Sequence, residues 1–136
     1  MSIQDFAGFL EAARSQPEPQ RLLLVFATAE LPEDASANEK ARFERGEGGA
    51  LVPAVFVDKT PQEITDFASL VTESRETGVD WVIVFVAAMS GRAGRAPSSE
   101  DAAEPLQAMV EAIKSGRIGN YLAVNREGDL VELAPG

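Results

Sequence analysis

The sequence predicts one α/β domain: a mixed sheet of about five strands, layered with helices and ending in a β-hairpin. Its 136 residues fit one domain with one compact core. Short apolar runs alternate with segments in which apolar residues recur at helical spacing. Two short apolar segments near the end flank a glycine-containing turn. We therefore expect residues 1–136 to form a single layered domain.

A helix and a buried strand are predicted first. Ser2, with Asp5 three residues later, is typical of a helix start. Apolar residues at helical spacing extend this helix over residues 3–14, before Pro17. Residues 22–27 form a continuous apolar run, as expected of a strand that is covered on both faces.

A second helix is predicted to start at Ser36, which has Glu39 three residues later. It ends near Gly46, and its apolar face is weak. A glycine-rich connection, residues 46–49, follows it. We expect residues 30–49 to be a mobile surface excursion.

The next strand is predicted over residues 51–57, where Pro53 favours an edge position or the start of the strand because it has no N–H to donate. Thr60 follows as a helix N-cap, with proline at the first helical position and Glu63 at the third. Apolar residues line one face of this third helix, and Gly78 ends it.

The most apolar stretch, residues 81–88, predicts a central strand. A fourth helix follows and ends at Gly116. Its start has two interpretations: Asp101 is the N-cap, or Glu104 is the N-cap and places Pro105 at the favoured first position.

Residues 121–124 and 130–133 are predicted to form the final hairpin. Helix-length connections between the earlier strands suit parallel neighbours joined by right-handed crossovers. We therefore expect a mixed sheet with an antiparallel hairpin at its end.

Composition excludes several functions. The chain has no cysteine and no histidine, so disulfides, thiolate or imidazole metal sites, a cysteine nucleophile and a Ser-His-Asp triad are excluded. Its formal net charge of −10 opposes binding to nucleic acid and to anionic membranes. No apolar run approaches the ~20 residues of a membrane helix, and the N-terminus lacks a basic signal region. We expect a cytoplasmic protein.

The loop after the central strand is the best candidate binding site. Between Asp80 and Glu100 the chain has two arginines and no acidic residue. Glycine-rich backbone before a helix, together with arginine, suits a small anionic ligand. The candidate ligand residues are Ser90, Gly91, Arg92, Gly94 and Arg95. The alternative interpretation is a surface turn, whose arginines pair with nearby carboxylates.

Asp58 and Lys59 complete the candidate site if strand ends meet in one crevice, where an open α/β sheet binds ligands. A second alternative is that they simply end a strand. We expect no catalytic residue and no cofactor. We also expect no metal site, because the acidic clusters lack the spacing of a calcium loop.

Several segments resemble a group of short proteobacterial proteins that carry the name ribonucleotide reductase subunit alpha. The resemblance rests on residues 16–21, 46–51, 57–61, 90–99 and 109–118 and spans nearly the whole chain. It implies kinship and no functional residues. A catalytic subunit of that enzyme forms a thiyl radical on cysteine, so the absence of cysteine excludes that activity here.

The sequence therefore favours a small non-catalytic domain that binds a protein partner or associates with itself, for example through a sheet edge. The alternative is a binder, or a weak enzyme, of an anionic metabolite or nucleotide at residues 91–95.

Overall fold

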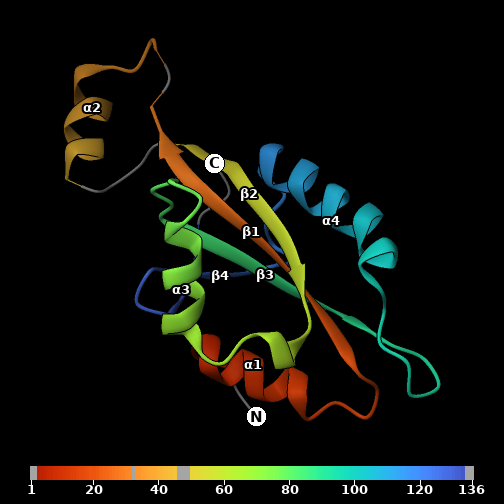
Figure 1. The fold of residues 1–136 in the computed structure, drawn as a ribbon. Coiled ribbons are helices and arrows are strands. Elements are labelled where there is room, and N and C mark those ends of the chain that lie inside the picture. Colours follow the sequence, from red (N-terminus) through yellow and green to blue (C-terminus); the bar gives the residue numbers. More distant parts are fainter. Residues whose placement is uncertain (1–2, 32, 46–49, 134–136) are drawn as a thin grey trace.

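The computed structural model describes residues 3–31, 33–45 and 50–133, and it shows a five-stranded sheet between two helical layers (Figure 1). The sheet has the strand order β2-β1-β3-β4-β5. The strands are β1 (Gln20–Glu30), β2 (Ala50–Lys59), β3 (Ile83–Ser90), β4 (Leu122–Val124) and β5 (Leu130–Val131). The helices are α1 (Phe6–Arg14), α2 (Ala37–Glu44), the short 3₁₀ helix η1 (Pro61–Glu63), α3 (Phe67–Arg75) and α4 (Ser99–Lys114). The predicted α/β domain and its C-terminal hairpin are confirmed.

The sheet separates two apolar cores because successive strand side chains point to opposite faces. In β1, Leu22, Leu24 and Phe26 pack under α1 and α3. Their neighbours in the chain, which start at Leu23, pack under α4 on the other face. β1 and β3 are thus covered on both faces, as their unbroken apolar runs predicted.

The expectation of parallel neighbours is wrong, since the four strand pairings in the described part of the chain are antiparallel. β1 lies between β2 and β3 and is antiparallel to both. The helical connection through α3 therefore does join two strands of the same direction, but it passes over β1 instead of joining neighbours. Helix-length connections constrain the relative direction of two strands, and they do not decide which strand lies between them.

The two edges of the sheet differ. Pro53 lies in the outer strand β2, so its predicted edge position is confirmed. The ladder with β1 shifts register there: Val55 lies opposite Phe26 and Pro53 opposite Ala27, which leaves Ala54 as a bulge. The other outer strand, β5, has only two residues.

The edge at β5 is covered by the chain segment before α1. The Leu130 N–H donates to the Gln4 carbonyl at 3.2 Å, and the Phe6 N–H donates to the Gly128 carbonyl at 2.8 Å. This pairing holds the segment extended, so α1 starts at Phe6 with Asp5 as its N-cap. The predicted start at residue 3 is therefore wrong, and Ser2 lies outside the described residues.

The third helix also starts later than predicted. Thr60 and Glu63 form the predicted capping box, but it starts only the three-residue η1. Buried Ile64 is extended, and a new N-cap, Asp66, starts α3 at Phe67. The Arg14 guanidinium stabilises this break between η1 and α3, because it donates a hydrogen bond to the Ile64 carbonyl at 2.6 Å.

α4 starts before both predicted caps. Ser98 is its N-cap and forms a capping box with Asp101, and Pro105 lies inside the helix. The buried residues Leu106, Met109 and others confirm the predicted apolar face. By contrast α2 has its predicted capping box but no buried residue, and it projects beyond the end of the sheet (Figure 1).

Candidate functional site

The predicted anion loop is the tip of a tight turn. Arg92 and Arg95 exchange two backbone hydrogen bonds of 3.0 and 2.9 Å. Ala93 and Gly94 between them both have positive φ, the combination of a type I′ turn. Gly91 precedes the turn and donates its N–H to the Pro19 carbonyl at 2.8 Å. These glycines therefore serve backbone geometry.

A carboxylate of the protein already takes the place of an anion at this turn. The Gly94 N–H donates to Glu18 Oε1 at 2.7 Å. Arg92 and Arg95 are exposed, and in the part of the chain that the structure describes neither guanidinium forms an ion pair. Ser90 ends β3 opposite Gln20 of β1, with its side chain exposed.

The structure does not bring Asp58 and Lys59 together with the arginines of the turn. Asp58 accepts from Arg21 at 2.7 Å and from the Ser99 hydroxyl at 2.6 Å. The Arg21 Nε–H also donates to the Pro97 carbonyl at 2.6 Å, so this cluster fastens the start of α4 to β1 and β2. Sequence reasoning missed Arg21, whose one signal is a cation at the start of an apolar strand.

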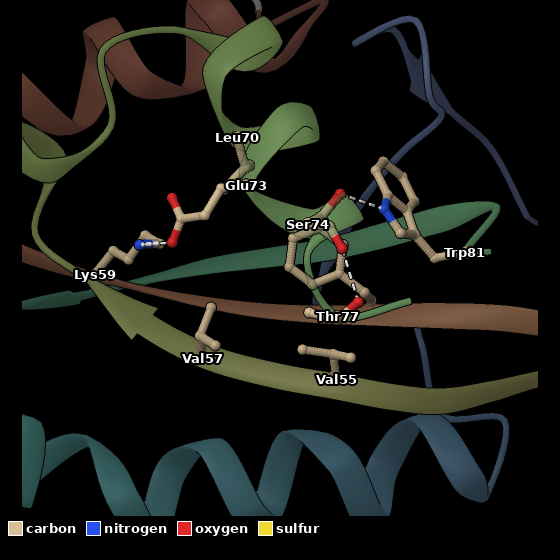
Figure 2. Close-up of a pocket in the computed structure, with 9 residues that line it drawn as sticks. Val55, Val57, Lys59, Leu70, Glu73, Ser74, Thr77 and Trp81 are labelled. Carbon is tan, nitrogen blue, oxygen red and sulfur yellow. Dashed lines mark hydrogen bonds and ion pairs between the residues drawn. The ribbon is translucent and has the colours of Figure 1, made fainter. Parts of the chain in front are cut away.

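Lys59 lies on the other face of the sheet, because it is the neighbour of Asp58 in the same strand. Its ammonium pairs with Glu73 of α3 at 2.7 Å. Here it borders a pocket of about 60 Å³ between β2 and α3, which Figure 2 shows in close-up. The apolar lining residues are Phe26, Val55, Val57, Leu70 and Trp81.

The polar groups of this pocket are mutually satisfied. Trp81 Nε1–H donates to Ser74 Oγ at 2.8 Å, and that hydroxyl donates to the Val71 carbonyl at 2.6 Å. The Thr77 hydroxyl donates to the Ser74 carbonyl at 2.7 Å and accepts from the Val79 N–H at 3.2 Å. The pocket therefore offers apolar surface and an ion pair at one end.

The pocket was not found from the sequence. Val55, Val57 and Lys59 alternate along one strand. Leu70, Glu73 and Ser74 share one face of α3, and Thr77 follows the helix. Each pattern is visible in the sequence, but nothing in it shows that the two faces meet.

A wider cleft of about 860 Å³ lies over β4, β5 and the segment after α4. Apolar and aromatic side chains such as Phe85, Ile118 and Tyr121 line it, together with Arg117. It lies on the α4 side of the sheet, away from every residue of the predicted site. Its rim includes Ile3 and Leu133, which border residues outside the described ranges.

Within the described ranges, no group of three or more acidic side chains is placed to hold a metal ion. No described helix is long and apolar enough to cross a membrane. Comparison with known proteins found no match among family models, curated proteins or solved structures.

Proposed function

We propose that this protein is a non-catalytic interaction domain of the cytoplasm, and that it binds an extended segment of a protein partner along the outer side of β2. Cytoplasmic placement agrees with a sequence that has no cysteine. In strand addition, main-chain hydrogen bonds supply affinity and pockets for alternate side chains supply specificity.

The observation that carries the proposal is the asymmetry of the two sheet edges. β5 is two residues long and is covered by residues 4–6. β2 has ten residues, and among the described residues no strand pairs with its outer side. Pro53 and the bulge at Ala54 interrupt its first half. Residues 55–59 keep an unbroken register with β1 and are long enough to pair with a further strand.

Apolar surface flanks these five residues on both faces. Phe56, the second residue of the segment, is 48% exposed on the α4 side. Val55 and Val57 face the pocket under α3 on the other side. The side chains of a partner strand paired here would therefore contact apolar side chains of β2 on both faces of the sheet.

The predicted alternative, an anion site at residues 91–95, receives less support from the geometry. The Gly94 N–H already donates to Glu18, and Asp58 and Lys59 are engaged by Arg21 and Glu73 on opposite faces of the sheet.

Selection of random peptides against the immobilised full chain tests the proposal. Enriched peptides are synthesised, and amide hydrogen exchange is measured with and without each one. We expect every second amide of residues 55–59, those whose N–H groups point away from β1, to exchange more slowly when a peptide is bound, because these groups become hydrogen-bonded. Failure to enrich a binder, or protection confined to other segments, contradicts the proposal.

A matched pair of variants locates the interface. Phe56 and Val82 are the two large apolar side chains exposed among the described residues, at 48% and 39%. Phe56→Ala should weaken peptide binding about tenfold, the scale of a moderate interface residue. Val82→Ala, before β3, should leave the affinity unchanged. Equal losses from both variants would rule out the β2 edge.

A further inference from the structure

We propose that the segment bound by β2 is a basic, extended stretch of another protein, which places one small apolar side chain in the pocket between β2 and α3. This inference rests on the proposed function and adds the chemistry of the partner. It follows from the position of the pocket, its size, its polar groups and the charge around it.

The pocket lies beside the edge that a partner strand would join. Val55, Val57 and Lys59 are the β2 side chains that face it, and they belong to the segment with unbroken register (Figure 2). In a sheet, every second side chain of an added strand points to the same face. One side chain of the partner therefore lies over the pocket, while its neighbours in the segment point to the α4 side near Phe56.

The size of the pocket selects a side chain and rejects a metabolite. Small-molecule sites usually enclose roughly 300–1,000 Å³, whereas this pocket has about 60 Å³. A branched aliphatic group such as that of valine matches this scale, and a nucleotide does not.

The polar lining leads to the same conclusion. Ser74 and Thr77 each donate and accept hydrogen bonds within the protein. A polar ligand group would displace these bonds or lose its own bonds to water, and both are unfavourable. An apolar group has neither cost, so the pocket favours an aliphatic anchor.

The charge around the pocket favours a basic partner. Residues 60–80, which include α3, contain five acidic residues and one arginine: Glu63, Asp66, Glu73, Glu76 and Asp80 against Arg75. Asp80 is paired with Arg126 at 3.0 Å and adds no free negative charge. Glu73 borders the pocket with its side chain 54% exposed. Glu76, the C-cap of α3, is also exposed and lies three residues after Glu73. The Lys59 side chain, 16% exposed, is paired with Glu73 and leaves little free positive charge here.

The same charge disfavours a second copy of this chain as the occupant. Each copy carries a net charge of −10, so two copies repel each other as they approach. A basic segment is attracted by the same field, and it binds faster and more tightly at low salt.

A set of labelled peptides about nine residues long, measured by fluorescence anisotropy, tests the inference. The reference peptide alternates lysine and threonine around one central valine. In an acidic twin glutamate replaces each lysine, and in an anchorless twin serine replaces the valine. At about 50 mM salt the reference should bind at least about tenfold more tightly than either twin. Equal binding of the reference and a twin overturns the inference.

Protein variants separate the two contributions. Glu76→Lys should weaken binding of the reference peptide severalfold, whereas Glu104→Lys, the same charge change at an exposed position of α4, should not. Val57→Phe fills the pocket and should remove the preference for valine over serine. If Val57→Phe does not fold, the comparison of valine and serine peptides on the natural chain still tests whether the pocket prefers an apolar anchor. A preference that survives pocket filling in a folded variant overturns the inference.

Amide exchange and sedimentation show which proposal fails. If a bound peptide protects residues 55–59 but is acidic or needs no apolar anchor, the edge is an interface and the partner class is wrong. If no peptide protects β2, the proposed function fails as well. A dimer that Phe56→Ala dissociates identifies a second copy as the occupant, and that also overturns the inference.

Discussion

Glu18 and Arg21 bind groups at one end of the sheet that the sequence suggested for ligand binding. The Glu18 carboxylate accepts a hydrogen bond from the Gly94 N–H, and Arg21 forms an ion pair with Asp58. The side chains of Arg21 and Asp58 are only 14% and 20% exposed, so this pair matters more to stability than an ion pair at the surface. Residues that suggest a ligand site in the sequence are thus used to join α4, β1 and β2.

Gly91 provides a test at the scale of one residue. A Cβ at this position would overlap the Arg95 carbonyl oxygen and lie 2.7 Å from the Pro19 carbonyl oxygen. Gly91→Ala should therefore lower the free energy of unfolding by about 1–3 kcal/mol, as overpacking does. Urea denaturation measures this value.

Gly119→Ala is the matched control, because a Cβ at Gly119 has no neighbour within 4 Å and its φ is ordinary. It should leave the urea midpoint almost unchanged. If the two alanine variants unfold at the same urea concentration, the close approach of backbones at Gly91 is not a constraint on the fold.

At the scale of elements, α2 and α4 both start with a capping box but differ in what they pack against. α4 buries five side chains on the sheet, whereas α2 has the same kind of start and buries none. Isolated helices of this length are marginal in water, so packing decides the stability of a helix more than its cap does. The predicted mobility of residues 30–49 remains a prediction.

A pair of proline variants tests the independence of α2. Ala41 and Ala108 are exposed residues inside α2 and α4. Proline costs about 3 kcal/mol inside a helix. Ala41→Pro should leave the thermal midpoint almost unchanged, because no described residue of α2 is fully buried. Ala108→Pro should lower it by many degrees. A large loss from Ala41→Pro would show that α2 supports the sheet.

At the scale of the whole molecule, carboxylates at helix starts link stability to pH. The backbone N–H of Thr60, and then its hydroxyl, lower the pKa of Glu63. Ser69 lowers the pKa of Asp66 in the same way, and Ser98 that of Asp101. All three groups bind protons less readily in the folded chain than in the unfolded chain.

The sign of the pH effect follows from these lowered values. Their contribution is fully present above the unfolded pKa of about 4. It is lost as the pH falls through that value towards the folded pKa, where protonated caps no longer accept as carboxylates. The free energy of unfolding, measured with urea from about pH 6 to about pH 3, should therefore fall on acidification.

The combined variant Glu63→Gln, Asp66→Asn and Asp101→Asn should flatten this acid decline. A control that neutralises three exposed carboxylates without capping roles, Glu104→Gln, Glu127→Gln and Glu132→Gln, should keep it. Equal declines in both variants would show that the caps do not link pH to stability.

The sequence alone determined the types of element and the residues of the core. Short apolar runs located the five strands of the described sheet, and apolar residues at helical spacing located the buried face of α4. Pro53 indicated an edge strand correctly, because a missing N–H is a local property. Helix starts were less certain: Asp66 and Ser98 took the roles predicted for Thr60 and for Asp101 or Glu104, since several nearby residues were able to cap.

The tertiary structure alone decided the strand directions, the partners of the charged side chains and the pocket between β2 and α3. Each depends on residues far apart in the chain, such as Lys59 with Glu73 or Arg21 with Pro97. Hydrophobic periodicity and capping act over a few residues, so they record which face of an element is buried. They do not show which other element buries that face. The free edge of β2 and the pocket of this protein depend on how the elements pack together.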